Sequence, residues 1–379
     1  MARRTIDLDT VQPNGKRGET QRPAFTKVNE NFADLYTDLD ELETTVQDLR
    51  RRQNGRNRLI NGDFRFWQRG SSRTVVSPLA VYVPDRFQVV CTGAGQVAVS
   101  RRSFDAPAFG VTGFMNCDLT GSTAATEAFV TQPVEGVQTL AGSTVTLSMQ
   151  AWAATPGCRI GVRFIQTFGT NGSPDVTVRA GVQEIGTAAA LRYFTVELPS
   201  IAGKTVGANS KLHVIVDFAT PGGYGGQLVG QSGSFSLTCM QLEKGATPTD
   251  YDMRDDATEL MLCQRYYEKS FPLEQAPQLG MPSPQGVAAA FQAGLARSEQ
   301  ISFKVAKRTV PALTLYSNSE VAPALGYWSL FNGNGWSRGM AVPLFLRPDG
   351  FTLQLDFGSG LTPFYAYLVG GNWAADAEI

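Results

Sequence analysis

Apolar residues between positions 25 and 49 recur at steps of three and four without interruption. This spacing predicts one long helix whose apolar residues form the narrow seam of a coiled coil. A single helix cannot bury such a seam against its own chain, so we expect copies of the chain to associate through residues 24–53. The seam consists of Phe25, Val28, Phe32, Leu35, Leu39, Leu42, Val46 and Leu49. Because aromatic and aliphatic residues both occupy its core positions, the pattern leaves two strands and three equally open.

After this helix the hydrophobic period changes to two. From Leu59 to Tyr251, short runs alternate apolar with polar residues, as Val145 and Leu147 do with their threonine and serine neighbours, and turns rich in Gly, Pro and Asn separate the runs. Each run predicts a strand with one face in a core. A long series of such strands predicts an antiparallel β-sandwich or jelly roll over residues 54–252.

Residues 253–270 interrupt the alternation and predict a short linking helix. Asp256 is its expected N-terminal cap, with Glu259 three residues later. Alternation resumes in residues 271–379, which predict a smaller antiparallel β domain with too few strands to close a large sandwich. We therefore expect this domain to pack against sister copies. The predicted fold class is mainly β, with an N-terminal helical coiled coil, a jelly-roll β-sandwich, a short linking helix and a smaller C-terminal antiparallel β domain.

The segments that flank the first helix carry turn residues and positive charge. Residues 1–23 include Asn14-Gly15 and show no apolar period, which predicts an extended arm that a partner orders. The basic run from Arg50 to Arg52 complements the dipole at the end of the helix, so it needs no ligand. With 33 Lys and Arg against 34 Asp and Glu, the balance of charge favours neither nucleic acid nor an anionic membrane as a partner.

Hydropathy and cysteine content indicate in which cellular compartment the protein is made. No apolar stretch reaches the roughly 20 residues that a transmembrane helix needs, so we expect no membrane insertion. The beginning, MARRTIDLDT, lacks the apolar core of a secretory signal. Scattered cysteines, odd in number and without a CxxC pair, predict buried free thiols in a protein made in a reducing cytoplasm. They are Cys91, Cys117, Cys158, Cys239 and Cys263.

A Gly-rich segment near residue 330 combines aromatic rings with amide and cationic side chains. Sugar recognition needs flat apolar faces for the ring and polar groups for the hydroxyls. Gly333, Gly335 and Gly339 predict a loop, which places these side chains at the surface. The candidate glycan-binding residues are Tyr327, Trp328, Asn332, Asn334, Trp336 and Arg338. The alternative is that the aromatic residues pack between subunits.

One further tryptophan is placed by the alternation of its strand. Trp152 falls on the outer face of its strand together with Ser148 and Gln150, which makes it a second candidate for glycan contact or for a subunit interface.

The residue types and their spacing give little support for catalysis, and we expect no enzymatic activity. A Ser-His-Asp or Cys-His arrangement would have to use His213, the only histidine, which lies in mid-strand without a GxSxG turn. Glycan hydrolysis needs two carboxylates at a controlled separation, and no acidic residue stands in a distinctive motif. A glycan depolymerase stays open as an alternative, because separation in space cannot be read from sequence.

Several segments resemble those of tailed-bacteriophage tail fibres or receptor-binding proteins. An N-terminal stretch resembles the attachment segment and helical stalk of such fibres, central stretches resemble their carbohydrate-binding-module-like jelly roll, and later ones resemble the following helix and C-terminal region. In chain order these stretches are GETQRPAFTKVNENFADLY, LINGDFRFWQRG, YVPDRF, VSRRSF, LAGSTVTLSMQAWA, QLEKGATPTDY, ELMLCQRYYEKS, VPALTLYS and NWAADAEI.

This resemblance implies a homotrimer in the virion tail, and it places Trp67, within the stretch LINGDFRFWQRG, in the core of the jelly roll. Residues 1–23 would attach the trimer to tail or baseplate proteins, and its distal end would bind a host cell-surface glycan or protein. Jelly-roll modules of this kind often hold a structural calcium ion near their first strand, for which Asp63 in the NGDF turn is the candidate ligand; ordinary turn chemistry is the alternative. No other cofactor is expected. The other functions that we consider are a tailspike depolymerase and a purely structural connector of the tail or baseplate.

Overall fold

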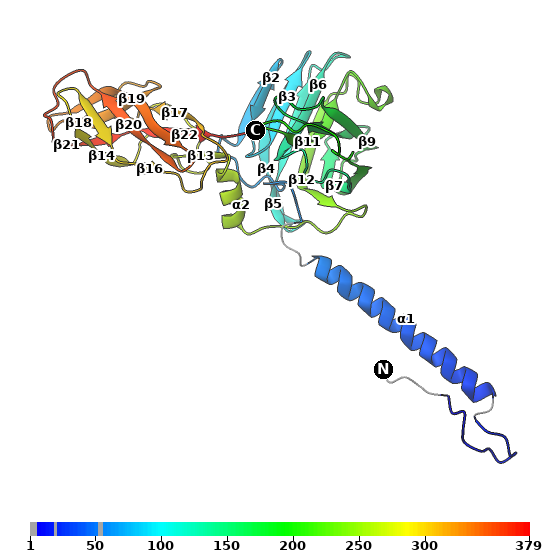
Figure 1. Cartoon of the computed structure of the whole chain (residues 1–379). Helices are drawn as coiled ribbons and strands as arrows, with labels where there is room; N and C mark the ends of the chain where they lie inside the picture. Colours follow the sequence, from blue (N-terminus) through cyan, green and yellow to red (C-terminus); the bar gives the residue numbers. More distant parts are fainter. Residues whose placement is uncertain (1–5, 19–20, 52–55) are drawn as a thin grey trace. The chain divides into compact units, whose positions relative to one another are not determined.

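The computed structural model describes residues 6–18, 21–51 and 56–379, and it divides the chain into two units, residues 1–55 and 56–379 (Figure 1). The first unit contains α1 (Gln21–Arg51), so the predicted long helix is present. It begins three residues before the expected position 24 and includes Pro23. A proline is tolerated in the first turn because the backbone N–H groups there have no partner within the helix.

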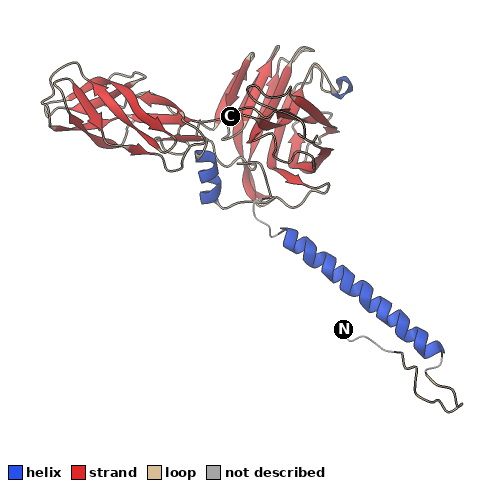
Figure 2. Ribbon diagram, viewed as in Figure 1, coloured by secondary structure: helices blue, strands red, loops and turns tan. Residues whose placement is uncertain are grey.

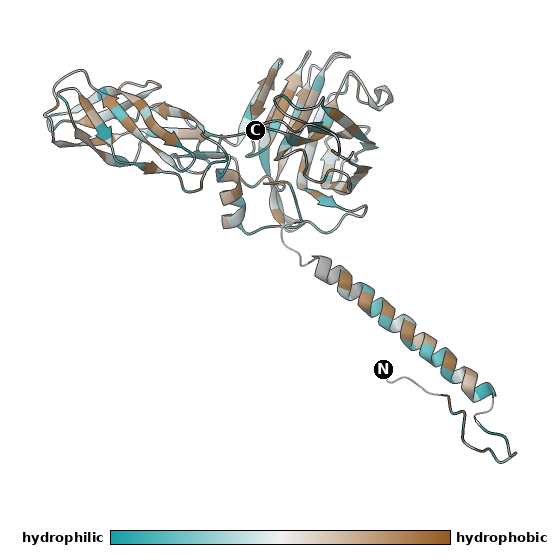
Figure 3. Cartoon of the chain, viewed as in Figure 1, coloured by the Kyte–Doolittle hydropathy of each residue, from teal (hydrophilic) through white to brown (hydrophobic). Residues whose placement is uncertain are grey.

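The apolar seam of α1 is uncovered in the single chain. Phe25 is 65% exposed, Leu35 60% and Leu42 58%, and brown apolar patches recur between teal ones along the helix in Figure 3. The side chain of Leu49 lies outside the described residues. The helix therefore has the seam that the spacing predicts, while its association with other copies stays a prediction.

Residues 6–18 fold back on themselves, although the sequence predicts an extended arm. The Gln12 N–H donates to the carbonyl of Lys16 at 2.7 Å, and the Gly18 N–H donates to the carbonyl of Thr10 at 2.8 Å. Gly15 adopts a φ of 78°, which permits the tight turn between them.

The second unit begins with two antiparallel six-stranded sheets packed face to face, in agreement with the predicted β-sandwich (Figure 2). One sheet, which we name the groove sheet, has the order β1 (Ser72–Val76), β4 (Gln96–Ala108), β5 (Val111–Thr120), β12 (Gly233–Lys244), β7 (Thr144–Ala153) and β10 (Ala190–Glu197). The other has the order β2 (Leu79–Tyr82), β3 (Gln88–Thr92), β6 (Glu127–Glu135), β11 (Lys211–Ala219), β8 (Arg159–Thr167) and β9 (Val176–Glu184).

The core lies between these sheets, and alternate side chains of each strand point into it. Leu147 from β7 and Phe164 from β8 are fully buried in it. Trp67, just before β1, is buried as predicted. A short 3₁₀ turn, η1 (Tyr224–Gly226), follows β11. All five cysteines are free and buried, as predicted.

The linking helix is shorter than predicted. It is α2 (Asp256–Gln264), and its N-cap is Asp255, whose carboxylate accepts the Thr258 N–H at 2.8 Å; Asp256 is already inside the helix. The helix ends at Gln264 because the chain then enters β13 (Tyr267–Lys269), which pairs with the last strand of the chain. Tyr267, which falls within the predicted helical range 253–270, is thus a strand residue.

The C-terminal domain closes on itself. Its main sheet has the order β15 (Leu295–Ser298), β14 (Gln285–Ala290), β21 (Ala366–Gly370), β18 (Tyr327–Phe331), β19 (Trp336–Arg347), β20 (Gly350–Asp356) and β16 (Ile301–Ser302). A further pairing of β15 with β20 closes this sheet into a barrel. A three-stranded sheet has the order β13, β22 (Asn372–Asp376) and β17 (Ala312–Tyr316).

Barrel closure shows that this domain has enough strands to close on itself, contrary to the reason given for packing against sister copies, and that packing stays a prediction. Closure satisfies both edges of the sheet, and the fully buried Leu330, Leu353 and Leu355 lie in a core of the domain's own. Within the described residues, neither helix is long and apolar enough to cross a membrane.

Candidate functional site

Trp152 lies in an open groove on the outer face of the groove sheet. As the alternation predicts, its side chain points away from the core, and it is half-buried. The ring of Phe114, from β5, lies 4.7 Å from the indole between centroids, and the ring of Phe104, from β4, lies 5.9 Å from it. The three rings form an aromatic floor that extends from β4 to β7 across the intervening β5 and β12.

Polar side chains continue this floor along one row of the sheet. In the strand register Asn116 of β5 stands opposite Ser236 of β12, which stands opposite Trp152 of β7. The Asn116 amide oxygen accepts hydrogen bonds from the hydroxyls of Ser236 at 2.9 Å and Ser234 at 3.0 Å, and its NH₂ donates to Asp118 at 3.0 Å. These bonds fix the orientation of each polar group before any ligand arrives.

The resulting Trp152 groove has a volume of about 390 Å³ and is open to solvent. Arg102 and Asp118 also line it, so it combines aromatic faces, hydroxyls, an amide and both signs of charge. This is the chemistry that sugar rings and their hydroxyls require. Sequence alone finds Trp152 but misses Phe104 and Phe114, because only the strand register brings β4 and β5 beside β7.

The predicted glycan-binding loop is instead a β-hairpin. Strands β18 and β19 pair with Phe331 opposite Trp336 and Ser329 opposite Arg338. Gly339, read as a loop glycine, lies within β19, where a Cβ would come within 2.4 Å of the Phe357 ring. The glycine is therefore needed for packing, and the hairpin sends its side chains to opposite faces of the barrel wall.

The six candidates of this segment consequently separate. Trp328 is buried on the inner face, whereas Tyr327, Trp336 and Arg338 lie on the outer face. The Arg338 guanidinium stacks over the Tyr327 ring at 4.7 Å, and the Trp336 ring packs on Phe331. Asn332 and Asn334 are exposed in the turn, where the Asn332 side chain accepts the backbone N–H groups of Asn334 and Gly335.

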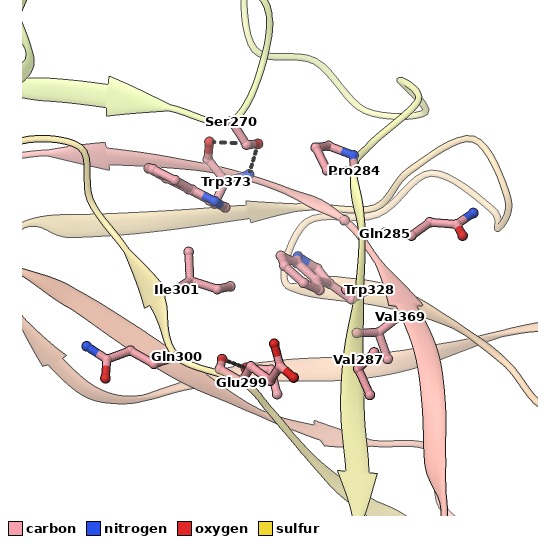
Figure 4. Close-up of a pocket in the computed structure, with 13 residues that line it drawn as sticks. Ser270, Pro284, Gln285, Val287, Glu299, Gln300, Ile301, Trp328, Val369 and Trp373 are labelled. Atoms are coloured by element: carbon pink, nitrogen blue, oxygen red, sulfur yellow. Dashed lines mark hydrogen bonds between the residues drawn. The ribbon is translucent and has the colours of Figure 1, made fainter.

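Trp328 lines a small pocket at one end of the barrel, together with a residue that the sequence does not single out (Figure 4). That residue is Trp373 of β22, a strand buried on both faces and therefore without alternation. The pocket has a volume of about 210 Å³ and lies between the start of β14 and the turn that joins β15 to β16.

His213 has no role that its surroundings would make catalytic. Its Nδ1 lies 3.4 Å from the Thr131 hydroxyl, on the outer face of β11. Burial, and secondly the nearby charge of Lys211, lower the pKa of the imidazole to about 4, so the ring is neutral at pH 7.

Carboxylates with raised pKa values are enclosed and already paired. Burial raises the pKa of Asp217 to about 6, yet this side chain is 0% exposed, accepts the Tyr224 hydroxyl at 2.8 Å and lies 3.0 Å from the Arg163 guanidinium. Asp85, whose pKa burial also raises to about 6, is buried as well and accepts two hydrogen bonds from Gln68. Neither carboxylate is accessible to a glycan.

Asp63 is held by a neighbouring cation. Its Oδ2 lies 2.6 Å from the Arg65 Nε, and burial raises its pKa. Across the part of the chain that the structure describes, no group of three His, Cys, Asp or Glu side chains could hold a metal ion. The structure gives no support to calcium at Asp63, because Arg65 supplies the positive charge.

Comparisons with known proteins identify no family by sequence. No family model matches the chain, and no curated protein matches it. Among solved structures, the chain is similar to a family 4 carbohydrate-binding module, with 15% identity, a TM-score of 0.30 and coverage of 49% of this chain and 98% of that one.

Two other solved structures show likenesses of the same order. The enzymatically active domain of tailspike protein 4 from bacteriophage CBA120 has 10% identity and a TM-score of 0.30, with coverage of 50% of this chain and 22% of that one. The family 11 carbohydrate-binding module of the Clostridium thermocellum cellulase Lic26A-Cel5E has 9% identity and a TM-score of 0.29, with coverage of 47% and 98%.

Proposed function

We propose that the chain is a non-enzymatic tail-fibre protein of a bacteriophage, which adsorbs the virion to a glycan of the host cell surface. The observation that carries glycan binding is the Trp152 groove, where an aromatic floor from Phe104, Phe114 and Trp152 adjoins a prearranged polar row. An aromatic floor and fixed polar groups on a rigid sheet suit a sugar ring better than a flat protein surface.

The fibre architecture is supported by the seam of α1. Its exposed apolar residues need other helices for cover, and the resemblance to tail fibres implies three copies. Joining copies through α1 would present several grooves to one surface, so individually weak sugar contacts would combine into strong adhesion. In this proposal residues 1–23 attach the trimer to tail or baseplate proteins.

The absence of an accessible acid pair among the perturbed carboxylates supports adhesion without hydrolysis. Asp85 and Asp217, the described carboxylates whose pKa values are raised to about 6, are both buried and hydrogen-bonded. A retaining or inverting hydrolase needs two carboxyl groups that both reach the glycosidic bond.

The test uses the full-length protein and a panel of immobilised bacterial lipopolysaccharides and capsular polysaccharides. Trp152→Ala should reduce binding at least tenfold, because it removes the largest ring of the aromatic floor. Tyr193→Ala is the matched control: it removes an exposed aromatic side chain from β10 of the same sheet, outside the groove.

Unchanged thermal unfolding of both variants would show that the sheet is intact. Equal loss in the two variants, or full binding by Trp152→Ala, would contradict glycan binding in the groove. Release of reducing ends from any polysaccharide would show a depolymerase, and failure of wild-type protein to bind any of them would favour a structural connector.

A further inference from the structure

The pocket at the end of the barrel contains an unpartnered hydrogen-bond donor. Trp328 is 6% exposed, and its indole Nε1 has no hydrogen-bond partner. In Figure 4 the nitrogen-bearing edge of this ring faces the side of the pocket where Ser270 and Trp373 lie. Buried donors nearly always find an acceptor, so this N–H is expected to meet one that the chain itself does not supply.

The indole is held rigidly in this position. A Cβ at Gly371 would come within 2.3 Å of the Trp328 ring, so the backbone of Gly371 lies directly against the pyrrole portion. On the other side of the pocket, Trp373 is fixed by ring contacts with Phe303 at 5.4 Å and Phe351 at 5.8 Å. Both tryptophans are therefore positioned before a ligand binds.

The rest of the lining combines apolar side chains with the amides of Gln285 and Gln300, and one acid stands at the rim. Val287 and Ile301 contribute aliphatic surface, and Glu299 projects from the turn between β15 and β16 (Figure 4). Glu299 is exposed and is the one charged side chain that lines the pocket. Its carboxylate has no hydrogen bond or ion pair with the described residues. A negatively charged ligand would be repelled here, and a neutral one with a donor group would be favoured.

We propose that this pocket binds the acetamido group of an N-acetylated amino sugar, an inference that rests on the proposed glycan-binding function. The carbonyl oxygen accepts the Trp328 N–H, the amide N–H donates to the Glu299 carboxylate, and the methyl group contacts Val287 and Ile301. One small group thus supplies the acceptor, the donor and the apolar surface that the pocket requires. The volume of about 210 Å³ suits one such group on a terminal sugar rather than a long chain.

The experiment is saturation-transfer NMR on the full-length protein in a Trp152→Ala background, which removes the contribution of the Trp152 groove. The probe is methyl N-acetyl-β-glucosaminide, with methyl β-glucoside as the matched ligand that lacks only the acetamido group. We expect the strongest saturation at the acetamido methyl protons, and at least a tenfold weaker signal for methyl β-glucoside.

Two variants assign that signal to the pocket. Trp328→Phe keeps an aromatic ring but removes the N–H, and Glu299→Ala removes an exposed side chain that the fold does not need; each should reduce the signal at least fivefold. Glu299→Gln keeps an acceptor oxygen and should restore most of it. Trp336→Phe, on the outer face of the hairpin, is the control and should bind as the parent does.

The proposal is overturned if the two methyl glycosides saturate equally, or if Glu299→Ala and Trp328→Phe retain the full signal. These results are separate from the test of the Trp152 groove. If Trp152→Ala abolishes polysaccharide binding, saturation transfer to the monosaccharide can still be measured. If the barrel pocket gives no saturation transfer, the result of the polysaccharide test still holds.

Discussion

The guanidinium of Arg86, at one end of the β-sandwich, is ion-paired with the carboxylate of Glu378, the penultimate residue of the chain. Arg86 is 1% exposed and Glu378 6%. Arg86 also donates to the Pro133 carbonyl at 2.6 Å and lies 3.4 Å over the Tyr266 ring. The last residues after β22 are thereby bound to the sandwich at a site closed to solvent.

Glu378→Ala should therefore destabilise the unit formed by residues 56–379. Removing one partner of a buried pair leaves the other charge uncompensated, and we expect a loss of about 3 kcal/mol in the free energy of unfolding, measured by urea titration. Glu184→Ala is the control, because Glu184 and Arg159 form a largely exposed pair at 3.5 Å. Its effect should stay below about 0.5 kcal/mol; similar losses in both variants would contradict the role of burial.

Charges introduced into the seam of α1 should separate the copies. Leu35→Lys combined with Leu39→Lys places two ammonium groups where apolar residues would meet, and we expect the mass measured by light scattering to fall to that of one chain. The control is Thr37→Lys, on the side of the helix opposite the seam. A wild-type protein that is already monomeric would contradict the proposed stalk.

His213 should make stability depend on pH in a defined sense. The pKa of its imidazole is about 4 in the folded chain against 6.5 ordinarily, mainly because of burial. As the pH falls from 6.5 towards 4, the unfolded chain takes up a proton that the folded chain does not, so the free energy of unfolding decreases.

His213→Gln should remove this dependence, a difference of about 2 kcal/mol between pH 7 and pH 4.5 after allowance for the partial exposure of the ring. Asp217, whose pKa is raised to about 6 by burial, acts in the opposite sense over the same range. Comparison of wild type with variant isolates the histidine. Parallel pH profiles for the two proteins would contradict the prediction.

Gly371→Ala should strain the barrel pocket. Its Cβ would come within 2.3 Å of the Trp328 ring, which cannot retreat because the ring is buried. We expect a loss of about 2 kcal/mol in the free energy of unfolding, with a change in tryptophan fluorescence. Gly335→Ala, where a Cβ meets open space in the β18–β19 turn, should leave the fluorescence unchanged.

The sequence predicts the features that depend on local spacing along the chain, but not those that depend on which strands pair. Alternation places Trp152 on the outer face correctly, because side-chain parity is a local property of a strand. The neighbours of Trp152 cannot be predicted in this way: Phe104 and Phe114 reach it through pairings between β4, β5, β12 and β7 that span distant parts of the chain. The local pattern therefore predicts the face of the sheet on which Trp152 lies, whereas the groove around it depends on the register of the strands.

The errors in the C-terminal domain have a similar physical origin. Glycine at position 339 indicates a loop by composition, but the Phe357 ring occupies the space of its missing side chain. The pairing of β15 with β20, which closes the barrel, involves a strand of four residues that is too short for a hydrophobic period. Trp373 is missed because its strand is covered on both faces.

If the chain is the tail fibre proposed above, closure of the barrel also bears on how such a fibre could change its target. Since the strands of the main sheet complete one another's hydrogen bonds within one chain, each copy of this domain can fold without exchanging strands with its neighbours. Substitutions in the connecting turns would then alter the surface that contacts a cell, while the contacts between copies stay unchanged. In such a design, altered host range requires no matching change in the stalk.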